Sequence, residues 1–222
     1  LVPEWNGEHP DLIVDASGRT RLTAKKLEIP ARVGSRKDIA YFAHYENFEA
    51  EGPKGQILIS RLQPSGWSWR IPLPDRMSVG VVMNKEVAET LGNTPEERLE
   101  AAIDRDPDLS MRGKMRKRVT DVPVYTNYQL ISERGYGPGW VAAGDAYGFV
   151  DPMLSPGLFI GMWSARLLGE IIPERPPVQL QAEFSRYAKR MYHMIDSWQR
   201  LVDAFYDGTV LSLIHISEPT RL

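Results

Sequence analysis

The segment GWVAAGDAYGFVDPMLSPG, residues 139–157, places a carboxylate and a helix start close together in the sequence. Trp140 to Ala143 predict a short buried strand, and Gly144 allows the chain to turn sharply and to approach a ligand closely. Asp145 then lies at the carboxyl end of that strand, the edge at which open α/β sheets bind ligands. Its carboxylate can accept hydrogen bonds from the hydroxyls of a sugar or a polyol.

The helix that follows has a start typical of an anion-binding end. Ser155 is a favourable N-cap, Pro156 fits the first helical position, and Gly157 leaves the second position bare. Unpaired N–H groups and partial positive charge at this end can stabilise a group that becomes anionic on reduction. Gly157, Gly161 and Ala165 recur every four residues, which predicts a flat stripe facing a sheet or a cofactor. The alternative is a strand, turn and helix that only pack together.

A second candidate is the stretch GWSWRIPLP, residues 66–74. Side chains alternate between the two faces of a strand, so Trp67, Trp69 and Ile71 share one face. The two prolines that follow end the strand, because proline cannot donate to the ladder. The strand is either an ordinary core strand, since large aromatic residues usually just pack, or an aromatic wall beside a cofactor or substrate channel.

The elements that must position these residues predict an α/β fold. A buried strand at residues 12–14 runs into the turn Asp15-Ala-Ser-Gly18. Alternating stretches separated by turn residues predict an antiparallel sheet between residues 38 and 83. Thr94, Pro95 and Glu97 form a capping box at the start of a helix. A long amphipathic helix with Phe184, Tyr187, Met191, Met194, Ile195, Trp198, Leu201 and Phe205 near one face is predicted close to the C-terminus.

Composition excludes several classes of function. The 222 residues carry a net charge of −2, which gives no field for binding nucleic acid or an anionic membrane surface. The chain has no cysteine and four scattered histidines, so we expect no metal site. No apolar run is long enough to span a bilayer, and no secretory signal pattern is visible. We therefore expect a cytoplasmic protein without nucleic-acid or membrane partners.

The order of three motifs resembles the FAD-dependent monooxygenase superfamily. These motifs are Asp15 to Gly18, the tryptophan strand, and Gly144-Asp145 followed by Asp151-Pro152 and Ser155-Pro-Gly157. Within that superfamily, WSWRIP is similar to the tryptophan-x-tryptophan-x-isoleucine-proline signature of the flavin-dependent halogenases. The Phe205-Tyr206 pair that ends the long helix is also similar to that family. The resemblance covers residues 11 to about 207 and implies a Rossmann-like FAD-binding domain, an inserted antiparallel substrate-binding sheet and a C-terminal helix.

The resemblance also implies a chemistry and its site. Reduced FAD reacts with oxygen, halide is oxidised to hypohalous acid, and a lysine receives it beside a small aromatic or apolar substrate. A separate flavin reductase supplies the reduced cofactor. Asp145 would contact the ribityl chain, Gly18 the pyrophosphate, and Pro152 to Gly157 the isoalloxazine, while Trp67 and Trp69 would separate flavin from substrate. The cofactor-binding residues are thus expected to be Asp15, Gly18, Gly144, Asp145, Pro152, Ser155 and Gly157.

Three departures from the family pattern limit this expectation. The glycine-rich nucleotide loop and the catalytic lysine are expected upstream of this chain, so no lysine here inherits that role. Leu154 stands where the tryptophan-halogenating branch has a glutamate. Pro156 has no N–H, whereas the family donates one toward chloride at that position. A flavin monooxygenase or dehydrogenase without halogenation, and a non-catalytic binding protein, therefore remain alternatives.

The domain boundaries follow from these motifs. We expect a partial FAD-binding domain at 1–30 and 119–175, a substrate-binding sheet at 31–118, and a C-terminal helix at 176–210. The segment 211–222 continues no pattern and is expected to be a non-native tail. The chain as a whole is expected to be a fragment that is inactive alone.

Overall fold

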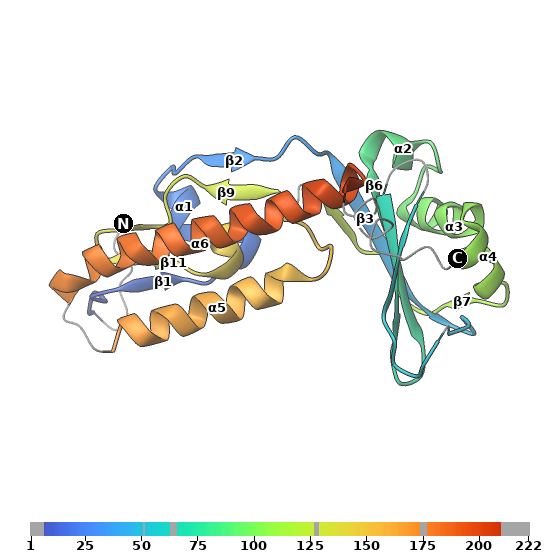
Figure 1. Cartoon of the computed structure of the whole chain (residues 1–222), viewed down its shortest axis with the longest axis horizontal. Coiled ribbons are helices and arrows are strands. Elements are labelled where there is room, and N and C mark those ends of the chain that lie inside the picture. The colour runs from blue at the N-terminus through green and yellow to red at the C-terminus, as the bar shows by residue number, and fades with distance from the viewer. Residues whose placement is uncertain (1–6, 51, 63–65, 127–128, 174–176, 210–222) are drawn as a thin grey trace, which may run out of the picture. The chain divides into compact units, whose positions relative to one another are not determined.

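The computed structural model describes residues 7–50, 52–62, 66–126, 129–173 and 177–209. The chain divides into two compact units. The first combines the residues up to Ser35 with those from Tyr128 onward, and the second is Arg36–Asn127 (Figure 1). The second unit is therefore inserted into the sequence of the first.

The first unit has a parallel strand pair at its centre. Strand β1 (Ile13–Asp15) runs parallel to β11 (Trp140–Ala142), and β10 (Tyr136–Gly137) joins β11 antiparallel. In the parallel pair Asp15 lies opposite Ala142. The carboxyl ends of both strands therefore meet at the same edge of the sheet.

A separate three-stranded sheet accompanies this pair. Strand β9 (Leu130–Ser132) lies between β12 (Gly148–Phe149) and β2 (Ala31–Val33), and both neighbours are antiparallel to it. Two single turns of 3-10 helix follow the parallel strands. They are η1 (Gly18–Thr20) after β1 and η2 (Gly144–Ala146) after β11.

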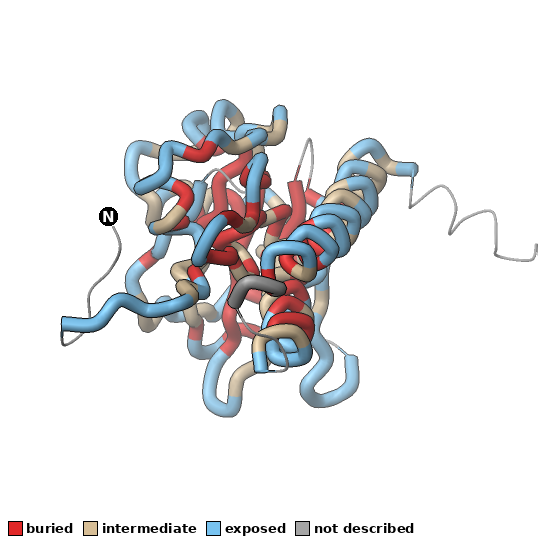
Figure 2. The backbone as a smooth tube through the Cα atoms, turned by 90° about the vertical axis from the view of Figure 1, so that its left-hand side faces the viewer, coloured by how far each residue is buried: buried red, intermediate tan, exposed pale blue. Residues whose placement is uncertain are grey.

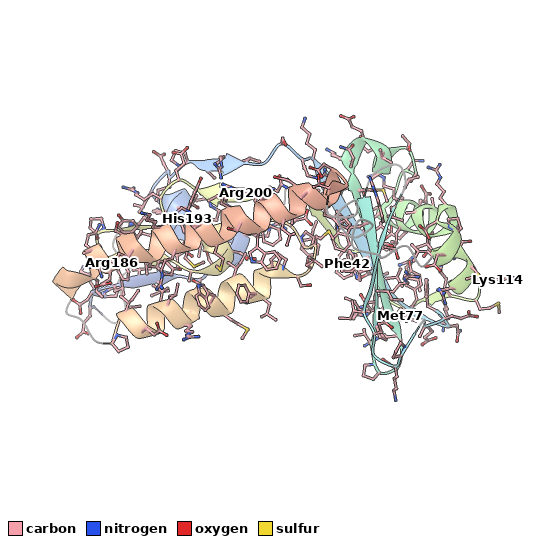
Figure 3. All side chains as sticks on the ribbon, in the orientation of Figure 1. Phe42, Met77, Lys114, Arg186, His193 and Arg200 are labelled. Carbon is pink, nitrogen blue, oxygen red and sulfur yellow. The ribbon has the colours of Figure 1, made fainter. Side chains whose placement is uncertain are left out.

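Three α-helices complete the described part of the first unit: α1 (Leu22–Lys26), α5 (Pro156–Ile171) and α6 (Pro177–Tyr206). Helices α5 and α6 run side by side in Figure 1. Buried and exposed residues alternate around α6, as the helical period requires (Figure 2). Arg186, His193 and Arg200, labelled in Figure 3, all lie on its exposed side.

The buried side of α6 agrees with the periodicity except near its end. Phe184, Tyr187, Met191 and Ile195 are at most 2% exposed, as predicted. The prediction for Leu201 is wrong, because that side chain is 41% exposed and the next residue, Val202, is buried instead. Because the helical period is not a whole number of residues, a small error in the assumed period moves the buried stripe by one residue toward the end of the helix.

The second unit contains the predicted antiparallel sheet. Its strand order is β4-β5-β6-β3-β7, and β8 also pairs with β3. The strands are β3 (Asp38–Glu46), β4 (Leu58–Arg61), β5 (Gly66–Pro72), β6 (Met77–Asn84), β7 (Lys117–Arg118) and β8 (Val124–Thr126).

Three helices of the second unit pack on one face of this sheet. The helices are α2 (Lys85–Glu89), α3 (Pro95–Arg105) and α4 (Pro107–Arg112). Thr94 and Glu97 form the predicted capping box of α3. Leu99, Ile103 and Leu109 from the helices join a core cluster with alternate residues of β3 and β6.

The ends of the inserted unit differ from the predicted 31–118. Strand β2 pairs with β9 and so belongs to the first unit, whereas β8 pairs with β3 and belongs to the second. Short strands such as these carry too little sequence pattern to reveal their partners. The predicted tail 211–222 lies outside the described residues.

Candidate functional site

Two turns lie against each other at the carboxyl edge of the parallel pair. Turn η1 begins at Gly18 and η2 begins at Gly144, and these glycines have φ of +63° and +56°. Residues other than glycine rarely adopt these backbone angles. The structure thus brings the two sequence motifs together at the edge where open α/β sheets bind ligands.

Asp15 shapes the first of these turns. Its Oδ1 accepts a hydrogen bond from Ser17 N at 3.0 Å, and its Oδ2 accepts one from Thr23 N at 2.7 Å. Burial acts to raise the pKa of Asp15, but the hydrogen bonds from Ser17 and Thr23 outweigh it and the pKa is lowered. The carboxylate is therefore kept ionised and holds the backbone around Gly18.

Asp145 is the carboxylate that remains available. Within the described part of the chain, no group donates a hydrogen bond to it. Burial raises its pKa, and the positive charge of Arg19 opposes this only in part. A half-buried carboxylate with unused acceptor atoms is a site for donors from a ligand.

Gly157 leaves space beside that carboxylate. A Cβ atom at this position would lie 3.6 Å from Oδ1 of Asp145 and 3.8 Å from the ring of Phe149. Gly157 is the second residue of α5, so its unpaired N–H group belongs to the positive end of the helix. Donors of a ligand at Asp145 and an anionic group at the helix end would both be accommodated here.

Arg19 is a functional candidate that the sequence reasoning missed. Its guanidinium lies 5.2 Å from the centre of the Phe149 ring, and its charge acts on Asp145. The only signal in the sequence was its place directly after Gly18, and a single arginine in a turn is not distinctive. Only the pairing of β1 with β11 brings Arg19 to Asp145 and adds a cation to the site.

Buried hydrogen bonds tie the second turn to both long helices. Gly144 N donates to Ser164 Oγ at 3.0 Å, and Tyr187 Oη donates to Ala142 O at 2.9 Å. Because the only hydroxyl proton of Tyr187 is used there, Ser164 donates to Tyr187 Oη in their 2.5 Å contact. Burial raises the pKa of Tyr187 to about 12, which keeps this phenol protonated. The strand end is thereby fixed to α5 and α6.

The loop before α5 is held in an unusual conformation. Leu154 and Ser155 both have positive φ, 59° and 53°. Such angles cost about 1–3 kcal/mol for residues other than glycine and often mark functional sites. Asp151, which is 1% exposed, accepts hydrogen bonds from Met153 N at 2.8 Å and from Tyr206 Oη at 3.3 Å. The loop that includes Pro152 is therefore fixed at its base.

The start of α5 is at the predicted position but is capped differently. Ser155 is the N-cap residue and Pro156 follows at the first helical position. The prediction of a side-chain cap is wrong, because Ser155 makes no such hydrogen bond. Its left-handed φ points the side chain away from the first turn, whereas a capping serine is extended. The N–H groups of the first turn of α5 are therefore not bonded to the Ser155 side chain.

Trp67 and Trp69 belong to the second unit, whereas the other predicted site residues belong to the first. Strand β5 pairs with β6 so that Trp67 lies opposite Val82 and Trp69 opposite Gly80. Val79 and Val81 of β6 face the helices, so both tryptophans face the other way. Trp67 is 2% exposed and its ring lies 5.5 Å from that of Trp69.

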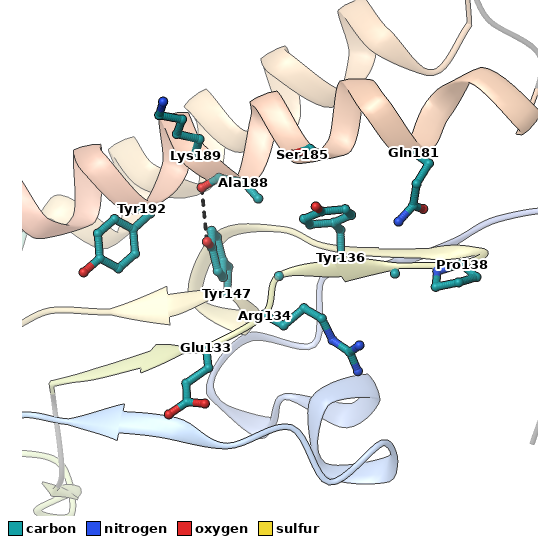
Figure 4. A pocket seen from close by; sticks show the side chains of 12 residues that line it. Glu133, Arg134, Tyr136, Pro138, Tyr147, Gln181, Ser185, Ala188, Lys189 and Tyr192 are labelled. Carbon is teal, nitrogen blue, oxygen red and sulfur yellow. Dashed lines mark hydrogen bonds between the residues drawn. The ribbon is translucent and has the colours of Figure 1, made fainter.

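A hollow of about 520 Å³ in the first unit lies between α6 and the segment 133–138 (Figure 4). The hydroxyl of Tyr147 donates to Ala188 O at 3.1 Å within it. Burial, then Tyr192 and Tyr136, raise the pKa of Tyr147 to about 12, so its phenol is neutral. None of the residues predicted for the cofactor lines this hollow. The candidate site is therefore the strand-end edge, not the hollow.

No three side chains of the metal-binding types gather to hold an ion in the described ranges. No helix in that part of the chain is both long and apolar enough to cross a membrane.

Comparison with protein families gives a match to the tryptophan halogenase family over residues 6–211. The chain belongs to this family. The match includes both the carboxyl-edge turns and the tryptophan strand, which the sequence analysis had linked to it.

Individual relatives carry different halogenase names. A tryptophan 2-halogenase of Chondromyces crocatus is 29% identical over 212 residues, which is 89% of this chain and 39% of the relative. A 1H-pyrrole-2-carbonyl-[peptidyl-carrier protein] chlorinase of Pseudomonas fluorescens is 25% identical over 94% of this chain and 49% of its own length. The chain thus spans less than half the length of these two curated relatives.

Solved structures have the same fold. The flavin-dependent brominase Bmp2 superposes with a TM-score of 0.83 at 25% identity, covering 95% of this chain and 55% of that one. The myxobacterial chondrochloren halogenase CndH superposes with a TM-score of 0.78 at 28% identity, covering 90% and 48%. The α/β fold predicted from the sequence is confirmed by this likeness.

Proposed function

We propose that this chain is part of an FAD-dependent oxidoreductase of the halogenase type. The observation that supports this most directly is the half-buried Asp145 carboxylate, which accepts no hydrogen bond within the described residues and lies beside Gly157 and the start of α5. Relatives of this chain are named flavin-dependent or FAD-dependent halogenases, which supports FAD as the ligand.

The residues present fit a flavin nucleotide. Asp145 offers acceptor atoms to polyol hydroxyls, and the open space at Gly18, where a Cβ would meet nothing within 4 Å, leaves room for a phosphate group. The helix end at Gly157 offers N–H groups and partial positive charge to a ring that becomes anionic. Arg19 adds positive charge at the same edge.

FAD supplies the redox chemistry with oxygen in this family, and the chain's own residues orient and shield the reaction. Asp145 and the start of α5 would hold the cofactor, and the fixed loop at Pro152 to Ser155 would limit its movement. For Trp67 and Trp69 we propose the role that the family resemblance implies, which is to separate substrate from flavin.

The proposed substrate is a small aromatic molecule. Leu154 is 51% exposed and places an apolar side chain where the tryptophan-halogenating branch has an acid. An amino-acid substrate held by that acid is therefore disfavoured, and a neutral ring such as a phenol or pyrrole fits better. A separate flavin reductase is proposed as the partner that supplies reduced FAD.

A second candidate is flavin chemistry without halogenation. Pro156 at the first position of α5 removes one backbone donor from a halide site. A flavoprotein/dehydrogenase from Cytophaga hutchinsonii also superposes with a TM-score of 0.77 at 25% identity. Halide dependence of the product distinguishes the two candidates.

The decisive experiment uses the full-length protein with FAD, a flavin reductase, NADH and phenol or pyrrole. We expect halogenated product that requires chloride or bromide. Asp145→Ala should weaken FAD binding about tenfold to a hundredfold, because a hydrogen bond to a charged group contributes about 1.5–3 kcal/mol.

Glu170→Gln is the matched control, since this carboxylate is exposed on α5 and pairs with Arg166 at 3.0 Å. Its FAD affinity should equal that of the wild type. Hydroxylated product formed equally well without halide would favour the second candidate. An absence of flavin binding by the full-length protein would reject both.

A further inference from the structure

Four aromatic rings form a row on the sheet face of the second unit that lies opposite to α2, α3 and α4. Tyr125 stacks on Phe42 with ring centres 6.1 Å apart, Phe42 lies 5.7 Å from Trp69, and Trp69 lies 5.5 Å from Trp67. These spacings are in the range of favourable aromatic pairs. The row runs from β8 across β3 to β5, and Phe42 is labelled in Figure 3.

Strand β6 lies between β3 and β5 and contributes no ring to this row. At the crossing point it has Gly80, which pairs with Phe42 on one side and with Trp69 on the other. A Cβ atom at Gly80 would lie 2.5 Å from Cε2 of Trp69, closer than real Cβ atoms approach other atoms. The indole of Trp69 therefore lies flat over the backbone of β6.

The conformation of the backbone does not require glycine here. Gly80 does not have a positive φ, and it pairs within the sheet as an ordinary strand residue. Glycine inside a strand is unfavourable unless a group approaches closely. The group that approaches is the indole of Trp69, so its orientation explains the glycine.

A hydrogen bond fixes the rotation of the same ring. Trp69 Nε1 donates to Ser78 Oγ at 3.3 Å, and Ser78 lies two residues from Gly80 on the same strand face. Ser78 is only 8% exposed. Gly80 thus allows the indole to lie close to the sheet. The hydrogen bond to Ser78 holds the Nε1 edge of the indole against β6.

We propose that Gly80 and Ser78 are positioning residues that hold Trp69 flat across the sheet and so fix the ring row. The functional part of this inference rests on the proposed function, in which Trp69 separates flavin from substrate. Without Gly80 the indole rises from the sheet and the contact with Phe42 is lost. Without the Ser78 hydroxyl the indole keeps its place but loses its fixed rotation.

The test measures the ring directly in the chain of 222 residues. Nitrogen-15 labelling gives one indole N–H signal for each of the six tryptophans, and Trp69→Phe identifies the signal of Trp69. Ser78→Ala should raise the hydrogen-exchange rate of that N–H about threefold to tenfold, as expected for the loss of one hydrogen bond. Ser78→Thr keeps the hydroxyl and should restore the slow exchange.

We expect the Trp67–Trp69 pair, with ring centres 5.5 Å apart, to give an exciton couplet in circular dichroism, and Gly80→Ala should remove it. Gly169→Ala is the matched control, because a Cβ at this exposed helix position meets nothing within 4 Å. The inference would be overturned if Gly80→Ala left the couplet unchanged and Ser78→Ala left the exchange rate of the Trp69 indole N–H unchanged. Since Ser78→Ala removes only one atom, a folding failure of Gly80→Ala leaves the test intact.

The functional consequence is measured in the full-length enzyme. Product formed per NADH consumed should fall in Gly80→Ala and Ser78→Ala, while the KM for flavin stays unchanged. If the wild type forms no halogenated product, the proposed function fails but the spectroscopic result still decides the positioning. If the wild type forms product and both variants match it, the functional role of the two residues is rejected.

Discussion

Tyr206, the last residue of α6, donates a hydrogen bond to Oδ2 of Asp151 at 3.3 Å, across 55 positions of sequence. The other oxygen of Asp151 accepts from Met153 N at 2.8 Å. One buried carboxylate thus joins the end of the long helix to the loop that precedes α5. The Phe205-Tyr206 pair, which resembled the family in sequence, has a structural reason in this contact.

Removing the Tyr206 hydroxyl should loosen that loop. In Tyr206→Phe the ring remains and Asp151 loses one donor, so we expect the amide of Met153 to exchange faster with solvent by about tenfold. Hydrogen exchange followed by NMR measures this. Tyr192→Phe, whose exposed hydroxyl lies on the same helix, is the control. Equal exchange in Tyr206→Phe and wild type would show that Asp151 holds the loop alone.

The two glycines where η2 meets α5 should respond differently to substitution. Gly144 has positive φ, and a Cβ there would lie 3.3 Å from Gly161 Cα, whereas a Cβ at Gly161 meets nothing within 4 Å. Gly144→Ala should therefore lower the free energy of unfolding by about 1–3 kcal/mol. Gly161→Ala, in a helix interior, should leave it unchanged or raise it. Urea unfolding of both variants tests this, and equal losses would contradict it.

Asp15 should stabilise the chain at neutral pH. Its folded-state pKa is lowered from its ordinary value of 3.8, so its contribution is present above pH 3.8 and is lost as pH falls through the lowered pKa. Asp15→Asn should reduce the free energy of unfolding by about 2 kcal/mol at pH 7, because one charged hydrogen bond is lost and another weakened. The difference should shrink toward zero in strong acid. A deficit that does not change with pH would point to packing instead.

Asp145, in contrast, should destabilise the folded chain at neutral pH. Burial raises its folded-state pKa, so its contribution to stability decreases as pH rises from 3.8 through the raised pKa. Asp145→Asn should therefore be more stable than the wild type at pH 7 and equal to it in acid. Thermal unfolding at several pH values measures this. A less stable variant at pH 7 would show that Arg19 compensates fully for burial.

The buried guanidinium of Arg70 depends on Asp108. The Arg70 side chain is 4% exposed and forms an ion pair with Asp108, which Arg112 also contacts at 2.9 Å. Burial alone would raise the pKa of Asp108, but the two arginines lower it. Asp108→Ala should cost about 3–5 kcal/mol of unfolding free energy, because a buried charge loses its partner.

Asp104→Ala is the control for this prediction. Asp104 is 61% exposed and pairs with Arg116, which also contacts Glu100 at 2.8 Å. An exposed ion pair contributes about 0–1 kcal/mol, so this variant should unfold almost as the wild type does. Similar costs for the two variants would mean that Ser60, at 2.6 Å from Arg70, compensates for the missing carboxylate.

The features that depend on neighbouring residues alone could be predicted from the sequence. The capping box at Thr94 and Glu97, the helical stripe through Phe184 and Met191, and the alternation along the tryptophan strand all follow from neighbouring residues. The turn glycines Gly18 and Gly144 were likewise visible, since positive φ favours glycine whatever the rest of the fold.

Which of these residues meet depends on how distant segments of the chain pair in the folded protein. Asp15 and Asp145 look alike in sequence, each following a short strand, yet one carboxylate is bound by its own turn and the other is left to accept a ligand. Arg19 and Gly80 gave no signal, because their roles come from Asp145 and Trp69, which reach them through the pairing of β1 with β11 and of β5 with β6. Strand pairing depends on contacts between distant segments, and no local pattern specifies such contacts.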